Sequence, residues 1–200
     1  MRRAKAILIG DEEDGRLRSH VANLALPRRA LSLPLRSDPP PGLHSFVELW
    51  GDEAELRASV SRWPLPVRAW LVEEHTPLAY ERSWPSGTPS PGVRLVSSLH
   101  RRMGISRDAF ARHWLGPHTR VALAYTVAVW HYSQNVVVEA LTGDSGVDGF
   151  VGMHFETAEQ MRARWSDHPQ EAARGAADAA RFMDASRSAS MVAEETVWEE

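Results

Sequence analysis

The sequence predicts an α+β fold in which two successive βαββαβ units, each with an antiparallel sheet, pack into an α/β barrel. Two observations lead to this prediction. Strand-like and helix-like segments follow one another in the same order in both halves of the 200-residue chain. Between the halves, residues 83–92 read SWPSGTPSPG, a composition typical of a connecting segment. We therefore expect a first unit at residues 1–84, a linker at 85–92 and a second unit at 93–200.

The first unit is predicted from six segments in the order strand, helix, strand, strand, helix, strand. These are residues 4–10, 11–26, 31–35, 44–50, the stretch after Asp52, and 67–72. Leu17, Val21 and Leu24 lie at helical spacing, whereas HSFVELW alternates as a strand does. Asp52 is a candidate N-cap, because its carboxylate can accept a hydrogen bond from the first helical turn. Pro34 suits an edge strand, since proline has no backbone N–H to donate.

The second unit repeats this order of elements. Its predicted segments are a strand at 93–99, a long helix at 106–125, strands at 127–141 and 149–155, helical stretches at 157–165 and 170–183, and a strand at 190–198. Ser106 and Thr157 each precede a run of helix formers and are predicted N-caps. The repeat lies in the order of elements and not in residue identity.

A βαββαβ unit forms a four-stranded antiparallel sheet with both helices on one face, which is the ferredoxin-like arrangement. The other face of each sheet is bare and has to be covered. Since one chain carries two such units, we expect the bare faces to pack against each other as a pseudo-dimer within the chain, around a central cavity. A homodimer of whole chains is the alternative way to cover them.

Composition excludes several function classes. A net charge of −3 gives no reason to expect nucleic acid or an acidic membrane as partner, and the absence of cysteine excludes disulfides and thiolate chemistry. No apolar run approaches the ~20 residues that span a bilayer. The apolar stretch near the N-terminus is short and runs into acidic residues, so it predicts a first strand and not a signal peptide. We expect a cytoplasmic protein whose partner is a small hydrophobic molecule.

A histidine occupies the apolar stripe of the predicted helix 106–125. Phe110, Trp114, His118, Val121 and Tyr125 follow one another at spacings that place residues on one helix face. Such an imidazole either bonds a backbone group freed by the neighbouring Gly-Pro pair or lines a cavity that small molecules enter. In the second case it suits proton transfer near neutral pH.

The second unit resembles the EthD domain of the dimeric α/β-barrel superfamily over roughly residues 93–198. The residues that carry the resemblance are Ser106, Phe110, Trp114, His118, Ala122, His131, Tyr132, Gln134, Asn135, Asp148, Gly149, Phe150, Asp178, Phe182 and Asp184. The resemblance implies a cavity used for chemistry without a tightly held cofactor. Relatives include decarboxylases, cyclases and isomerases of polyketide and lactone substrates, heme-handling enzymes and quinone-forming monooxygenases.

From the pattern and the resemblance together, we expect a catalytic group and a set of substrate-binding residues. The expected catalytic residues are His118, His131 and Tyr132, and the expected substrate-binding residues are Trp114, Tyr125, Trp130, Asn135, Phe150 and His154. No metal site and no cofactor are expected. The predicted function is His general acid/base catalysis on an apolar, carbonyl-bearing substrate, by a lyase, cyclase or isomerase. The alternatives are a non-catalytic ligand-binding or accessory protein and a cofactor-free monooxygenase.

One position departs from the family pattern. Many EthD domains carry an acidic residue in the third strand, where this chain has Gly152. His154 lies two positions further on and therefore on the same strand face. The missing carboxylate favours the binding alternative, whereas the histidine on the apolar helix face favours an enzyme.

Overall fold

The computed structural model describes residues 4–10, 15–35, 43–64, 66–124, 128–143 and 146–199. The strands are β1 (Ala4–Gly10), β2 (Arg28–Pro34), β3 (Ser45–Gly51), β4 (Val67–Leu78), β5 (Val93–Leu99), β6 (Val129–Thr142), β7 (Gly149–Phe155) and β8 (Ala189–Glu199). The helical segments are α1 (Gly15–Ala22), α2 (Glu53–Ser61), α3 (Arg107–His113), the π-helix η1 (Trp114–His118), α4 (Thr119–Ala124), α5 (Ala158–Ser166) and α6 (Pro169–Ala179).

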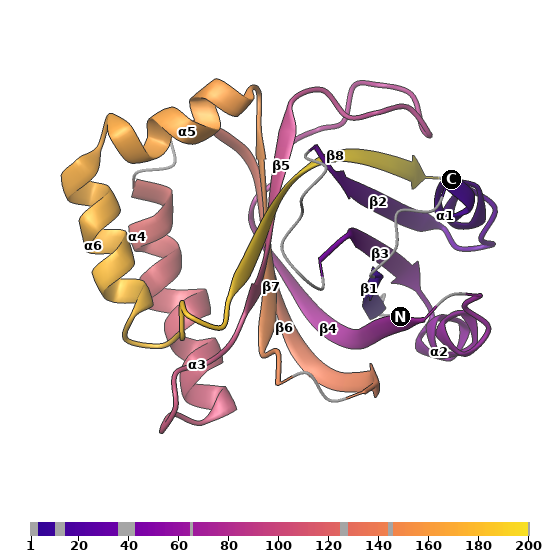
Figure 1. Cartoon of the computed structure of the whole chain (residues 1–200), viewed down its shortest axis with the longest axis horizontal. Coiled ribbons are helices and arrows are strands. Elements are labelled where there is room, and N and C mark those ends of the chain that lie inside the picture. Colours follow the sequence, from indigo (N-terminus) through magenta and orange to yellow (C-terminus); the bar gives the residue numbers. More distant parts are fainter. Residues whose placement is uncertain are drawn as a thin grey trace.

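The strands form a closed barrel in which every neighbouring pair is antiparallel. The order around the barrel is β1-β3-β2-β8-β5-β7-β6-β4. Within it, β4-β1-β3-β2 and β8-β5-β7-β6 have the same internal order, and the β2–β8 and β4–β6 pairs join them. The predicted α+β class, the antiparallel pairing and the barrel are confirmed. Helices α3 to α6 cover one side of the barrel, and α1 and α2 lie on the opposite side (Figure 1).

The predicted N-caps begin their helices as expected. The Asp52 carboxylate accepts from Ala54 N, Ser106 Oγ from Ala109 N and Thr157 Oγ1 from Gln160 N. A π-helical turn containing Pro117 interrupts the predicted helix 106–125 at its Gly-Pro pair. Proline lacks the N–H that the α-helical ladder needs, so the ladder changes register at this point.

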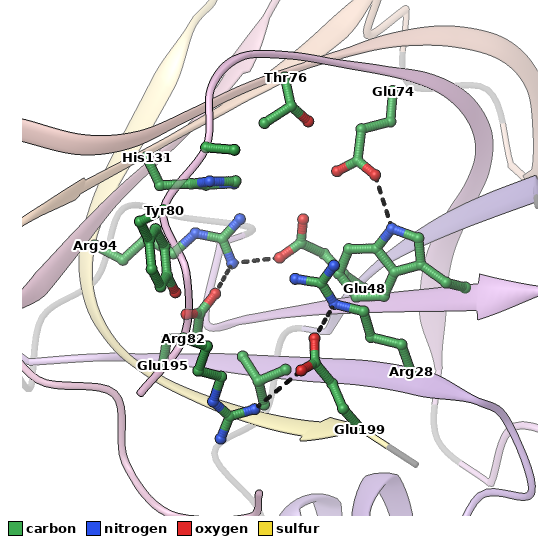
Figure 2. Close-up of a pocket in the computed structure, with 13 residues that line it drawn as sticks. Arg28, Glu48, Glu74, Thr76, Tyr80, Arg82, Arg94, His131, Glu195 and Glu199 are labelled. Carbon is green, nitrogen blue, oxygen red and sulfur yellow. Dashed lines mark hydrogen bonds and ion pairs between the residues drawn. The ribbon is translucent and has the colours of Figure 1, made fainter. Parts of the chain in front are cut away.

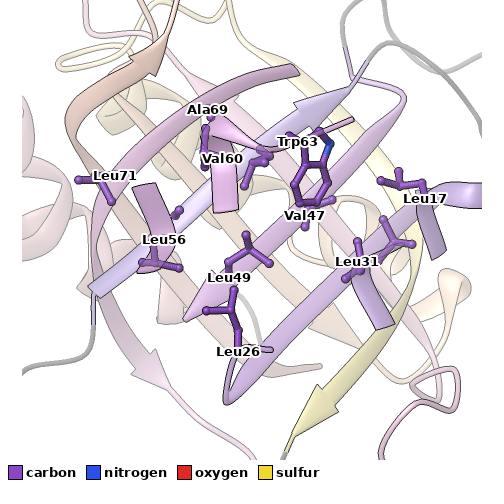
Figure 3. Packing of buried hydrophobic residues seen from close by; sticks show 13 residues of the cluster. Leu17, Leu26, Leu31, Val47, Leu49, Leu56, Val60, Trp63, Ala69 and Leu71 are labelled. Atoms are coloured by element: carbon purple, nitrogen blue, oxygen red, sulfur yellow. The ribbon is translucent and has the colours of Figure 1, made fainter. Parts of the chain in front are cut away.

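Four apolar clusters of described residues result from the alternation of side chains along the strands, and the smallest contains Ala30, Trp50 and Val197. One lies between the sheet and helices α1 and α2 (Figure 3). A second lies between the sheet and α3 to α6 and includes Phe110, Trp114 and Tyr132. The third fills part of the barrel lumen and includes Phe46, Trp70 and Phe150. A residue on one strand therefore faces either the lumen or a helix layer, and the two faces offer separate environments.

The segment between β4 and β5 is not an extended spacer. Gly87 N donates to Val197 O at 2.8 Å and Ser90 N to Glu195 O at 2.7 Å, and Pro89 forms a bridge with Thr196. The residues predicted as a linker therefore lie along β8. No helix among the described residues is long and apolar enough to cross a membrane.

Candidate functional site

The EthD-like half contains a cluster of two histidines and one aspartate in its helix layer. His118 Nδ1 lies 2.9 Å from Asp178 Oδ2, and His113 Nε2 lies 3.0 Å from Asp178 Oδ1. His118 comes from the end of η1, His113 from the end of α3 and Asp178 from α6. His118 therefore lies outside the barrel. The sequence had led us to expect that it faces a cavity between two sheets, and the structure does not place it there.

The π-helical turn is tied to the sheet by polar side chains. Thr119 Oγ1 donates to the Trp114 carbonyl at 2.9 Å, and Gln134 Nε2 donates to the same carbonyl at 3.2 Å. Gln134 Nε2 also donates to the Tyr132 hydroxyl at 3.0 Å. Trp114 and Tyr132, both predicted site residues, are thus buried next to one another in the helix layer and fix the turn that carries His118.

The protonation of this cluster follows from burial and pairing. Burial lowers the pKa of His118, and the hydrogen bond to Asp178 opposes the shift without reversing it. Burial tends to raise the pKa of Asp178, but its hydrogen bonds from His118 and His113 outweigh this and lower it. At neutral pH the pair is therefore an ionised carboxylate beside a neutral imidazole, and Asp178 accepts from the Nδ1–H.

A second polar cluster lies inside the barrel (Figure 2). Arg94 Nη1 bonds Glu48 Oε2 and lies 2.5 Å from Glu195 Oε1, while Lys5 Nζ lies 2.8 Å from Glu48 Oε1. Burial disfavours ionised Glu48, but Arg94 and Lys5 outweigh this and hold its pKa well below its usual range. Lys5 also lies 2.5 Å from Glu74. These buried side chains can remain ionised because each is paired with a side chain of opposite charge.

A cavity of about 360 Å³ adjoins this cluster. Its lining residues are Arg28, Glu48, Trp50, Glu74, Thr76, Ala79, Tyr80, Arg82, Arg94, His131, Glu195, Val197 and Glu199. Burial, followed by the charge of Glu195, raises the pKa of Tyr80 to about 12. Burial, followed by the charge of Arg94, lowers the pKa of His131 to about 4. Both groups are therefore neutral at pH 7.

The other predicted site residues fall into the lumen or outside the described residues. His131 lines the cavity, and the Trp130 ring stacks on His154 with centroids 5.8 Å apart. Phe150 belongs to the lumen core, and its carbonyl accepts from Asn135 Nδ2 at 3.2 Å. Tyr125 lies outside the described residues. The structure therefore divides the predicted site between two faces of one sheet.

The sheet also keeps three of the expected site histidines apart. His118 lies in the helix layer, whereas His131 and His154 lie on the lumen side. Among the described residues, no group of three histidine, aspartate or glutamate side chains is arranged to hold a metal.

Sequence reasoning missed the charged residues of the lumen. The signal was present in strand 44–50, where Glu48 shares a face with Phe46 and Trp50, because a charged residue between two inward aromatic residues marks a polar interior. The partners Arg94 and Glu195 are distant in sequence, so their pairing followed only from the closed barrel. Asp178 was among the residues of the resemblance, but without a role.

Comparison with known proteins finds a family match in the second half of the chain. Residues 102–186 match the family model of the EthD domain, and this range contains His113, His118 and Asp178. The chain is thus an antiparallel α/β barrel in which residues 102–186 match the EthD domain model. None of the curated proteins matches the sequence.

Solved structures share the fold across the whole chain. A crystal structure of an anthrone oxidase-like protein has a TM-score of 0.70 at 10% identity, covering 98% of this chain and 92% of that chain. A monooxygenase-like protein from Listeria innocua has a TM-score of 0.54 at 9% identity, covering 96% and 93%. A heme-degrading enzyme from Listeria monocytogenes has a TM-score of 0.52 at 10% identity, covering 94% and 98%. At these identities the similarity shows the fold alone.

Proposed function

We propose that this protein is a small-molecule enzyme in which His118, oriented by Asp178, moves a proton on an apolar, carbonyl-bearing substrate. The bond of 2.9 Å between His118 Nδ1 and Asp178 Oδ2 carries the proposal. A carboxylate that accepts from Nδ1–H fixes the tautomer in which Nε2 holds the lone pair. No described residue is shown to bond Nε2, so its lone pair is not engaged within the described part of the chain.

The electrostatics of the pair suit a general base. The lowered pKa keeps the imidazole neutral at pH 7, which is the form that accepts a proton, and Asp178 then stabilises the imidazolium. Removal of a proton next to a carbonyl gives an enolate, the first intermediate of many cyclisations and isomerisations. A single base can therefore catalyse the first step of the lyase, cyclase and isomerase reactions that the resemblance to the EthD domain implies.

The surroundings of His118 also support this role. Its ring lies edge-on to Phe182 with centroids 4.8 Å apart, and it ends a π-helical turn, a feature frequent at functional sites. Phe110 and Trp114 are buried in the same layer. An aromatic, weakly polar environment favours a flat apolar substrate.

The test is proton exchange on an aromatic ketone. Anthrone is the probe, because a protein of the same fold is named anthrone oxidase-like. In D₂O, the purified protein is expected to accelerate deuterium incorporation at the anthrone methylene, followed by ¹H NMR. His118→Gln should reduce the enzymatic rate by about 10²-fold or more, which is the usual contribution of a general base.

His113→Leu is the matched control, since it removes the other bond to the same carboxylate. It should leave most of the exchange rate. If both variants lose exchange rate and melting temperature to the same extent, the role of the cluster is to hold α6 against α3. Binding of anthrone without accelerated exchange would instead support the accessory-protein alternative.

A cofactor-free monooxygenase is the second candidate, supported by the names of the anthrone oxidase-like and monooxygenase-like structures. Here the enolate formed by His118 reacts with dioxygen, and anthrone plus O₂ gives anthraquinone plus water. Oxygen uptake that exceeds autoxidation, equals quinone formed and disappears in His118→Gln would support this reaction. Exchange without oxygen uptake would exclude it for this probe.

We also propose that the two halves are a pseudo-dimer derived from one βαββαβ unit. The support is their common internal strand order, β4-β1-β3-β2 and β8-β5-β7-β6. Since all strands of the closed barrel come from one chain, closure requires no second copy.

A further inference from the structure

The lumen cavity lies on the opposite side of the sheet from His118 and has a different chemistry. Its volume of about 360 Å³ is within the range of small-molecule sites. Three arginines, Arg28, Arg82 and Arg94, line it together with Trp50 and Tyr80. In Figure 2 the side chains of Arg28, Arg82 and Glu199 lie together at one side of the cavity, and Arg94 and Glu48 lie deeper.

Three residues around this cavity carry a buried nitrogen that lacks a hydrogen bond. These atoms are Arg28 Nε, Arg82 Nε and His131 Nδ1, and none has a hydrogen-bond partner among the described residues. A buried donor without a partner costs free energy, and most such groups in folded proteins are satisfied. Three such atoms around one cavity show that the charged and polar groups there are incompletely paired among the described residues.

The expected charge of a ligand follows from how the glutamates that line the cavity pair with its arginines. Arg94 is already bonded to both Glu48 and Glu195. Arg28 and Arg82 have only Glu199 as carboxylate partner among the described residues, at 2.8 Å and 3.8 Å, and the shorter contact lacks hydrogen-bond geometry at Nε. The Glu199 side chain is 38% exposed, so it can leave this position at little cost.

We propose that the cavity binds a small aromatic carboxylate whose carboxylate group replaces that of Glu199 on Arg28 and Arg82. Paired guanidinium groups recognise a carboxylate by charge-assisted hydrogen bonds. The ring of the ligand lies in the space lined by Trp50, Tyr80 and His131. This binding site is separate from the proton-transfer site proposed above and does not depend on it.

Isothermal titration calorimetry with 2-naphthoate and its neutral analogue 2-naphthamide tests the proposal. The acid should bind at least tenfold more tightly than the amide. Arg82→Gln should weaken naphthoate binding at least tenfold, whereas Glu199→Gln should strengthen it severalfold by removing the internal competitor. Arg57→Gln is the matched control, because Arg57 is exposed and pairs with Glu53 and Glu139 on the outer surface. It should leave the affinity unchanged.

Several results would overturn the assignment. Equal affinity for acid and amide would show that the arginines do not recognise the ligand. Absence of naphthoate binding to both the wild type and Glu199→Gln would exclude the site, and this result does not depend on the folding of an arginine variant. Loss of binding in His118→Gln would place the probe in the helix layer, and equal weakening by Arg57→Gln would reduce the effect to net charge.

Discussion

Gly152 explains how a buried guanidinium fits inside the barrel. A Cβ at this position would lie 2.7 Å from Arg94 Nη2 and 2.9 Å from Ser133 Oγ. Arg94 occupies that space and is held there by Glu48 and Glu195. Gly152 is therefore associated with a buried charged network that includes residues from both halves of the chain.

Gly152→Ala should lower the free energy of unfolding by about 1–3 kcal/mol, because the added methyl group overpacks the lumen and displaces Arg94. Chemical denaturation measures this change. Gly116→Ala is the control, since a Cβ there meets nothing within 4 Å. Similar stability of the Gly152→Ala variant and the wild type would show that Arg94 can move without loss.

His131 makes stability depend on pH. Its pKa of about 4 in the folded protein lies below the unfolded value of about 6.5, so between these values the unfolded chain binds more protons. The free energy of unfolding should therefore fall as the pH is lowered from about 6.5 to about 4, with a contribution from His131 on the order of 3 kcal/mol. His131→Asn should flatten this part of the profile, measured by urea unfolding at several pH values. His75→Asn, at the partly exposed His75, is the control, and the proposed origin is wrong if both variants keep the wild-type slope.

At the scale of secondary-structure elements, the side chain of Arg29 caps the C-terminal end of helix α1. Arg29 Nε donates to Val21 O at 3.1 Å, Nη2 to Ala22 O at 2.8 Å and Nη1 to Leu26 O at 2.6 Å. The last carbonyls of a helix have no partner within it, and a cation there also complements the helix dipole. Arg29 lies on β2, so this contact fixes α1 against the sheet.

Arg29→Met should destabilise the protein by about 2–4 kcal/mol, because it keeps an aliphatic side chain but leaves three carbonyls, two of them in buried bonds, without a charged donor. Thermal unfolding followed by circular dichroism measures the loss. Arg57→Met, on the surface of α2, should change the melting temperature little. Equal effects of the two substitutions would show that the carbonyls find other partners.

At the scale of the whole molecule, closure of the barrel makes the two halves depend on each other. The pairs β2–β8 and β4–β6 join them, and the lumen core and the Arg94 network include residues from both. Neither half can bury its lumen face alone. The boundaries at residues 84 and 93, the homodimer and the cytoplasmic location stay predictions.

The chain should therefore unfold in one cooperative transition. Far-UV circular dichroism, which reports both halves, and tryptophan fluorescence should give coincident midpoints in urea. Substitutions on either side of a joining pair should shift the same transition. Two separated midpoints would contradict this dependence and show that the halves unfold independently.

The order of elements could be predicted from the sequence because it depends on local signals. Alternation marked the strand 44–50, and Asp52, Ser106 and Thr157 marked helix starts. The location of His118 could not be predicted. An apolar helix stripe shows that a face is buried, but not whether it is buried against the lumen or against a second helix such as α6. The lumen charges depend on pairs distant in sequence, such as Glu48 with Arg94.

The contact between residues 87–90 and β8 has a consequence for how this gene can change. Surface connections usually tolerate insertions, because loop-closure entropy grows slowly with length. Here the backbone of Gly87 and Ser90 is in register with Val197 and Glu195, while Tyr80 and Arg82 of the same connection line the cavity. Amino-acid replacements within this stretch can preserve both the pairing with β8 and the position of the cavity-lining residues. An added or deleted residue would shift the paired residues relative to those that line the cavity. Natural variants should thus differ here in composition and agree in length.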